Sequence, residues 1–158
     1  MKCYLNNRYQ RTKISSEYSE WSKLTLGVPQ GSILGPLLFN IFINDLFLFI
    51  VKTSICNFAD DNTLHSCAKT LEEVISNLEY DLKIVLDWFS SNILVANPGK
   101  FQMLVLGNKN ISVEISVAGV KIKSTDSVEL LGINIDNTLS FSEHIKTLCS
   151  ITKTESGV

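Results

Sequence analysis

Cysteine is scarce in this 158-residue chain, and no two cysteines are spaced as C-x-x-C: they are Cys3, Cys56, Cys67 and Cys149. Zinc sites use closely spaced Cys and His ligands, and the chain adds only His65 and His144, so the spacing argues against zinc. Scattered cysteines with apolar neighbours indicate a reducing environment. No apolar signal-peptide core follows Met1, and we therefore expect an intracellular protein, in either nucleus or cytoplasm.

A strong overall charge is also missing, since the formal net charge is −2 and the isoelectric point is near 5.7. Domains that bind nucleic acids are usually basic, so the global charge does not indicate such a partner. The first stretch differs, because five cations stand there against Glu17 and Glu20: Lys2, Arg8, Arg11, Lys13 and Lys23. Phosphate binding and a solvated strand face explain this stretch equally well.

One long hydrophobic run, residues 33–51, approaches membrane-spanning length. Polar groups that are costly in lipid interrupt it, together with one proline: Pro36, Asn40, Asn44 and Asp45. A buried helix is therefore favoured and no membrane partner is expected. The chain has 45% apolar and 19% charged residues, a globular composition, and its length fits one domain.

The residue patterns predict an α+β fold, with helices packed on one face of a mostly antiparallel sheet. Strands are expected over residues 3–14, 18–26, 53–58, 63–68, 93–96, 101–106, 111–117, 120–123 and 128–135. A first helix is expected from a cap at Ser32 to about Ile50. A second begins at a capping box, Thr70 with Glu73, and runs to about Ser91. A third runs from Ser140 or Ser142 through Cys149.

Two adjacent carboxylates, Asp60 and Asp61, stand between two of these apolar strands. Along a regular strand they would point to opposite faces, but at a hairpin tip both can approach one side. Like charges that close raise a pKa or recruit a cation, and Mg²⁺ prefers such oxygen ligands. The pair has the character of half a two-metal site for phosphoryl transfer. Taken alone, however, the tetrapeptide Ala59–Asn62 favours a solvated turn.

Residues 27–39, GVPQGSILGPLLF, are followed by Asn44-Asp45-Leu46. Together they resemble the loop-helix motif of reverse transcriptases of the non-LTR (LINE- and jockey-like) retrotransposon type. Phe58-Ala59-Asp60-Asp61 resembles the catalytic hairpin, and Asn97-Pro98-Gly99-Lys100 resembles the turn that bears the family's lysine. Residues 4–10, 130–136 and 141–145 look like the flanking stretches. The order of these motifs over nearly the whole chain makes the resemblance specific.

The resemblance implies an RNA-directed DNA polymerase palm that uses Mg²⁺ or Mn²⁺, with an RNA template, a DNA primer and dNTP as partners. It assigns the metal to Asp60 and Asp61, and the approach to the triphosphate to Lys100. Nucleotide and template binding fall to Gln30, Gly31, Phe58 and Arg8. Phe58 stands where many relatives carry Tyr, so it would stack without a hydroxyl. For Arg8, a nucleic-acid contact and a surface ion pair are both open.

The resemblance also implies a partial palm over residues 1–139 and the start of a thumb over 140–158. Palms of this kind carry a further catalytic aspartate on a strand upstream of the loop motif, whereas no acidic residue precedes Glu17 here. We therefore expect residues 1–158 alone to lack polymerase activity. The alternative function is a non-catalytic nucleic-acid-binding or assembly module that keeps the same scaffold.

Overall fold

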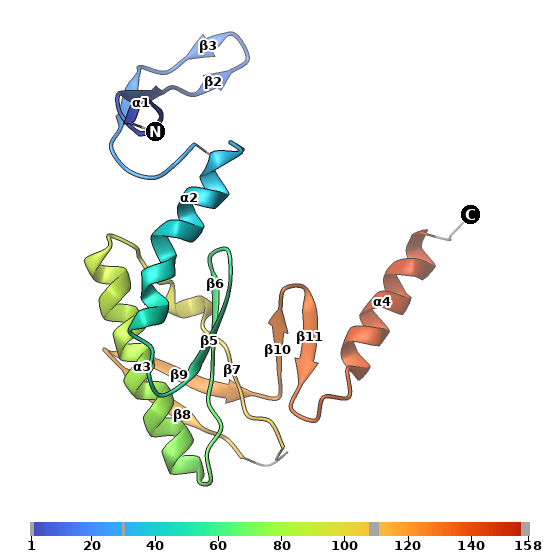
Figure 1. The fold of residues 1–158 in the computed structure, drawn as a ribbon. Coiled ribbons are helices and arrows are strands. Elements are labelled where there is room, and N and C mark those ends of the chain that lie inside the picture. Colours follow the sequence, from blue (N-terminus) through green and yellow to red (C-terminus); the bar gives the residue numbers. More distant parts are fainter. Residues whose placement is uncertain (1, 30, 108–110, 156–158) are drawn as a thin grey trace. The chain divides into compact units, whose positions relative to one another are not determined.

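The computed structural model describes residues 2–29, 31–107 and 111–155 (Figure 1). Contacts between residues divide the chain into two compact units. Unit 1 joins Met1–Phe49 to Ile55–Thr63, and unit 2 joins Ile50–Ser54 to Leu64–Val158. Helices and strands occur in both units, so the predicted α+β class is confirmed. Among the described residues, no helix has the length and apolar character that crossing a membrane requires.

Unit 1 begins with the short helix α1 (Lys2–Leu5) and four short strands: β1 (Arg8–Gln10), β2 (Lys13–Ile14), β3 (Glu17–Tyr18) and β4 (Ser22–Leu24). β1 pairs with β4, and β2 pairs with β3, both antiparallel. The prediction of one strand over residues 3–14 is wrong at its start. Asn7 adopts a left-handed φ of 54° after α1, a conformation that commonly ends a helix.

The next helix, α2 (Leu34–Ile43), continues as a 3-10 helix, η1 (Asn44–Leu48). The predicted helix therefore exists, but its regular α part ends seven residues before Ile50. The change falls at Asn44 and Asp45, two residues with low helix propensity. Ile43 and Leu46 are buried on this segment, whereas Leu37, Ile41 and Leu48 are exposed, so the prediction of a buried helix is wrong for most of its apolar residues.

Unit 2 is organised by the long helix α3 (Leu71–Ser91). The Thr70 hydroxyl accepts a hydrogen bond from the Glu73 N–H at 3.2 Å, which confirms the predicted cap. The remaining elements are η2 (Pro98–Lys100), β7 (Met103–Leu104), β8 (Glu114–Val117), β9 (Val120–Thr125), β10 (Ser127–Leu130), β11 (Ile133–Asp136) and α4 (Ser142–Glu155).

The core of unit 2 lies between α3 and the three-stranded sheet of order β7-β9-β8. Buried Val113, Ile115 and Ile122 pack against the apolar face of α3, which supplies Leu71, Ile75 and Leu82. β8 alternates exposed and buried residues because one face is solvated and the other meets the helix. The stripe of apolar residues along α3 is therefore core, as its spacing predicts.

Two strand predictions and the predicted end of one helix in unit 2 differ from the structure. Residues 93–96 form no strand, and the single strand expected over 128–135 is the antiparallel hairpin β10–β11. Leu131 and Gly132 make its turn with φ values of 51° and 80°, the pair of positive angles that a tight hairpin turn needs. The final helix extends to Glu155 rather than Cys149. The described strands form five small sheets. Among their strand pairings, only β7–β9 is parallel.

Candidate functional site

The two carboxylates lie at the tip of the hairpin formed by β5 (Ser54–Phe58) and β6 (Asp61–His65). Only Ala59 and Asp60 connect the strands, so Asp61 is already a strand residue rather than part of a longer turn. Ala59 turns the chain with a φ of 54°. Residues 55–63, which include the tip, belong to unit 1.

Two amides hold the hairpin tip together. Asn57 Nδ2 donates to the Ala59 carbonyl at 2.8 Å and to Asn62 Oδ1 at 2.9 Å. Asn62 Nδ2 donates in turn to the Asp60 carbonyl at 3.1 Å. The Asp60 and Asp61 carboxylates are exposed, and within the described chain neither accepts a hydrogen bond nor joins an ion pair. The tip is therefore ordered by its amides, and its carboxylates remain available to a ligand.

The donor set fits a hard divalent cation, because both groups are anionic oxygens and Mg²⁺ prefers such ligands. It is also incomplete, since the described residues bring no three His, Cys, Asp or Glu side chains together as a metal cluster. Two carboxylates alone leave most of the coordination shell to water and substrate phosphates. We therefore expect weak metal binding by the isolated chain.

Arg8 faces the backbone at the start of the loop that precedes α2. Its Nη2 donates to the Leu26 carbonyl at 3.3 Å and to the Gly27 carbonyl, and its Nε donates to the Leu5 carbonyl at 3.2 Å. A guanidinium can serve several acceptors at once because its donors form a rigid fork. Arg8 thus ties β1 to the loop, which is a third role besides the nucleic-acid contact and the ion pair predicted for it.

The other end of the loop is closed by Ser32 and Gly35. Ser32 Oγ donates a hydrogen bond to the Pro29 carbonyl at 2.7 Å and accepts one from the Gly35 N–H at 3.1 Å. It also forms a hydrogen bond with the Tyr4 hydroxyl. The predicted capping interaction is therefore present, although α2 itself begins at Leu34. A Cβ on Gly35 would lie 2.9 Å from Ser32 Oγ and 3.2 Å from the Pro29 carbonyl oxygen. Only glycine lets the loop lie this close to the helix.

The remaining predicted site residues are distributed between the two units. Gly31 has a φ of 75° and open space where a Cβ would stand, and Phe58 is 66% exposed; both belong to unit 1 with Arg8 and the carboxylate pair. Lys100 is exposed at the end of η2 in unit 2, where Asn97 Oδ1 accepts from the Gly99 N–H at 3.1 Å. Gln30 lies outside the described residues.

One buried carboxylate on α3, that of Asp81, was not predicted from the sequence. Asp81 has no exposed surface and accepts four hydrogen bonds from the segment just before β5. Its donors are the N–H groups of Val51, Lys52 and Thr53, at 3.3, 2.8 and 2.6 Å, and the Thr53 hydroxyl at 2.8 Å. The sequence signal was an acidic residue inside the apolar stripe of α3, between Leu78 and Leu82. A buried charge there requires dedicated donors.

A second carboxylate, Asp136, organises the connection from β11 to α4. It accepts from the backbone N–H groups of Thr138, Ser140 and Phe141 at 3.0, 3.1 and 2.8 Å, and from the hydroxyls of Thr138 and Ser140. These hydrogen bonds, led by the Thr138 hydroxyl, hold the pKa of Asp136 well below its usual range. Asp136, the last residue of the 130–136 stretch that resembles the family, therefore stabilises the turn before α4.

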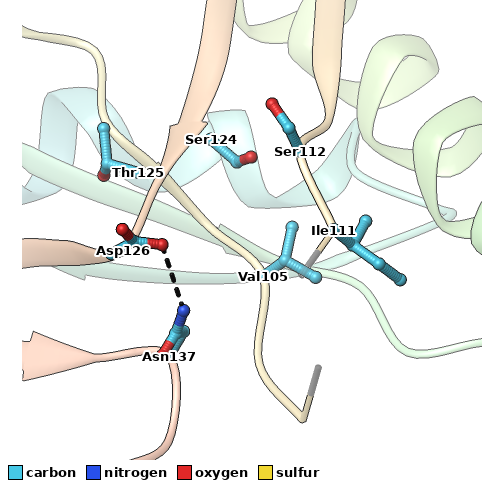
Figure 2. A pocket seen from close by; sticks show the side chains of 7 residues that line it. All are labelled: Val105, Ile111, Ser112, Ser124, Thr125, Asp126 and Asn137. Atoms are coloured by element: carbon cyan, nitrogen blue, oxygen red, sulfur yellow. Dashed lines mark hydrogen bonds between the residues drawn. The ribbon is translucent and has the colours of Figure 1, made fainter. Parts of the chain in front are cut away.

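A shallow cavity of about 470 Å³ lies in unit 2 beside β9 (Figure 2). Asn137 Nδ2 donates a hydrogen bond to Asp126 Oδ1 at 3.3 Å. The close view shows this pair on one side of the cavity and Val105 and Ile111 on the other. None of the predicted site residues lines this cavity. It therefore adds nothing to the candidate site.

Comparisons with known proteins agree with the motifs. The model of the family described as "Reverse transcriptase (RNA-dependent DNA polymerase)" matches residues 1–135. The chain is 30% identical over 158 residues to a probable RNA-directed DNA polymerase from transposon BS of Drosophila melanogaster, covering 92% of this chain and 17% of that protein. It is 27% identical over 156 residues to the RNA-directed DNA polymerase from mobile element jockey of the same organism, covering 94% and 17%.

A third relative is the retrovirus-related Pol polyprotein from type-1 retrotransposable element R1 2 of Nasonia vitripennis, which is 30% identical over 129 residues. That match covers 76% of this chain and 32% of the relative. The chain thus spans from about one sixth to one third of the length of these relatives. No solved structure matches the chain significantly.

Proposed function

The chain belongs to the reverse transcriptase (RNA-dependent DNA polymerase) family, and from this premise we propose that it forms part of the palm of an RNA-directed DNA polymerase. The proposal is carried by the β5–β6 tip taken together with the family match over residues 1–135. At this tip Asp60 and Asp61 are adjacent, exposed carboxylates without protein partners among the described residues. Because the chain covers 17% of its first relatives, the activity, substrates and partners of the whole protein are proposals too.

Asp60 and Asp61 would hold Mg²⁺ or Mn²⁺. When bound, the metal supplies electrostatic stabilisation of the charge that develops on phosphoryl oxygens. The protein's part is to present two oxygen ligands on a short, well-held turn, which the Asn57 and Asn62 amides support by binding backbone carbonyls instead of the carboxylates. A two-metal arrangement requires further ligands beyond this pair.

The reaction would be template-directed nucleotidyl transfer: the primer 3′-hydroxyl attacks the α-phosphate of a dNTP paired with RNA, and pyrophosphate leaves. Gln30 and Gly31 would line the nucleotide pocket, with Arg8 holding their loop through the Leu26 and Gly27 carbonyls. Phe58, exposed beside the tip, offers a stacking surface for a base or sugar. Lys100 would neutralise charge on the leaving pyrophosphate.

Residues 1–158 alone should not polymerise, because the described part of the chain assembles two carboxylates at the tip and no larger cluster. Primer extension on poly(rA)/oligo(dT) with Mg²⁺ or Mn²⁺ should therefore give no incorporation by the isolated chain. Clear incorporation that disappears in Asp60→Ala would contradict this expectation while supporting the catalytic assignment.

The catalytic assignment itself is tested in a chimera, in which residues 1–135 replace the matching segment of the jockey polymerase. We expect RNA-directed incorporation by the chimera and background signal for its Asp60→Asn and Asp61→Asn variants. An Asp87→Asn variant is the control, since it makes the same chemical change at an exposed position of α3. Incorporation that survives the loss of both hairpin carboxylates would refute the assignment.

A second candidate function is a non-catalytic nucleic-acid-binding module. The cations of residues 8–24 favour it, because they gather on a chain whose net charge is otherwise negative. Such a module would bind an RNA–DNA hybrid equally well in EDTA and in Mg²⁺. The chimera would then show no incorporation even though both Asp60 and Asp61 are present. The hybrid-binding and chimera assays together separate the two functions.

A further inference from the structure

The N-terminal hairpin, residues 8–24, brings cationic and aromatic side chains together. The register pairs Tyr9 with Lys23 and Lys13 with Tyr18. Residues opposite each other in an antiparallel pair lie on the same face, so Tyr9 lies beside Lys23 and Lys13 lies beside Tyr18. Arg11 stands between the two short sheets. Between the two pairs the returning strand has one residue more than the outgoing strand, which is the arrangement of a β-bulge.

The bulge brings Trp21 onto the same face, as its ring contact with Arg11 demonstrates. The guanidinium carbon of Arg11 lies 4.6 Å from the Trp21 ring centroid and 3.8 Å from that of Tyr18. Lys13 Nζ lies 5.3 Å from the Tyr18 centroid. We call this surface the cationic face. It comprises the four residues that these ring contacts join, Arg11, Lys13, Tyr18 and Trp21, together with the Tyr9–Lys23 pair, which stands two residues from Arg11 and Trp21 along the chain.

The rings of the cationic face are open to solvent even though they contact cations. Tyr9 is 54% exposed, Tyr18 49% and Trp21 60%. An arginine stacked on a ring uses the flat side of its guanidinium and keeps its N–H edge for other acceptors. The face therefore offers both ring surface and hydrogen-bond donors to a ligand.

The charges of the cationic face are not neutralised within the part of the chain that the structure describes. No carboxylate there lies within ion-pair distance of Arg11, Lys13 or Lys23, and none of the three donates a hydrogen bond. Glu17 pairs with Ile14, a neighbour of Lys13, and so belongs to the opposite face. Three cations thus gather on one side of a chain whose net charge is −2.

We propose that the cationic face binds a single-stranded nucleic acid. Phosphates contact Arg11, Lys13 and Lys23, and an unstacked base lies on Trp21 or Tyr9. A single strand is favoured over a duplex because only its bases present free faces for stacking. An acidic protein segment would match the charges but would leave the exposed rings without a role. The inference rests on the proposed function, since template or primer would supply the strand.

Charge is tested first, with the whole chain in EDTA and a labelled oligo-U RNA of about 12 nucleotides, by fluorescence anisotropy. Three phosphate contacts predict that log K falls with log salt at a slope of about −2, and the double variant Lys13→Gln/Lys23→Gln should lower the slope to about −0.7. The matched control is Lys121→Gln/Lys123→Gln, which removes two exposed lysines from β9. Equal weakening by both double variants would overturn the proposal.

Stacking is tested through Trp21. Trp21→Ala should weaken RNA binding about 10-fold or more, whereas Trp21→Phe should retain most of it. Quenching of tryptophan fluorescence is expected with RNA and not with inorganic polyphosphate, which has no bases. If polyphosphate competes and Trp21→Ala binds RNA normally, the site is only a polyanion patch and the proposal fails. It also fails if Trp21→Ala changes self-association but not RNA affinity, because the face is then an interface between copies.

The RNA-binding proposal for the cationic face and the metal-binding proposal for the hairpin tip can each be rejected without the other. Asp60→Asn should leave RNA binding in EDTA unchanged, because the hairpin tip takes no part in the cationic face. Lys13→Gln/Lys23→Gln should leave Mn²⁺ binding at the tip unchanged for the same reason. A wild-type chain that binds Mn²⁺ at the tip but does not bind oligo-U RNA would reject the cationic face alone. A wild-type chain that binds the RNA but not Mn²⁺ would reject the metal assignment alone.

Discussion

Removal of the Asp81 carboxylate should destabilise unit 2 more than any exposed substitution on α3. Asp81 is fully buried and accepts four hydrogen bonds from Val51, Lys52 and Thr53. Hydrogen bonds to charged groups contribute roughly 1.5–3 kcal/mol each. Val51 is 65% exposed, so water can replace part of what is lost. We therefore expect Asp81→Ala to cost about 3–5 kcal/mol, below the simple sum of its bonds.

Urea unfolding measures this cost, and hydrogen exchange locates it. Asp81→Asn keeps one acceptor oxygen and should lose less, about 2–3 kcal/mol. Asp87→Ala is the matched control, because Asp87 is exposed six residues further along α3 and should change stability by no more than about 0.5 kcal/mol. The amides of Lys52 and Thr53 should exchange faster only in the Asp81 variants. A cost below about 1 kcal/mol with unchanged exchange would refute the reasoning.

Three further outcomes follow from single contacts. Thr70→Ala removes the hydroxyl that accepts from the Glu73 N–H, so thermal melting should report a loss of about 1 kcal/mol, and Thr70→Ser should restore it. Gly35→Ala places a Cβ 2.9 Å from Ser32 Oγ, which must then move away from the N–H of residue 35. Hydrogen exchange at the amide of residue 35 should become faster in this variant, and an unchanged exchange rate would refute the close approach. The lowered pKa of Asp136 predicts stability that is present above the ordinary value of 3.8 and is lost as pH falls below it. Asp136→Asn should remove this acid dependence, and an unchanged acid unfolding profile would contradict it.

The helix α3 could be predicted almost to the residue, because its cap and its apolar stripe are local signals. Thr70 and Glu73 mark the start, and residues at helical spacing such as Ile75 and Leu82 mark the buried face. The hairpin β5–β6 was also predicted from its short apolar runs, although β6 spans Asp61–His65 rather than residues 63–68. Patterns that repeat within a single element need no tertiary information.

Other features depend on partners far away in the sequence. In the sequence, Asp81 only interrupts an apolar stripe. Its hydrogen-bond donors, Val51–Thr53, lie some 30 residues earlier and are brought to it by the fold. From the sequence, Arg8 is predicted only as a surface cation. In the structure its guanidinium donates hydrogen bonds to the Leu26 and Gly27 carbonyls. The hairpin β10–β11 was missed because Leu131 at a positive φ is unusual for a branched apolar residue, and only Gly132 signalled a turn.

The candidate site followed from motif order rather than from physics alone. Asp60 and Asp61 by themselves favour a solvated turn, and their exposure in the structure is compatible with that local description. The family match over residues 1–135 is what gives the pair its polymerase context.

Mn²⁺ binding by the hairpin tip tests the central claim most directly. Paramagnetic broadening of amide signals should appear first at Asp60, Asp61 and their neighbours, at low Mn²⁺ and in excess over any effect near exposed Asp87. Asp60→Asn with Asp61→Asn should abolish the broadening at the tip, and excess Mg²⁺ should reverse it in the wild type. Broadening that is uniform over the exposed carboxylates, or that survives in the double variant, would contradict a metal site at this hairpin.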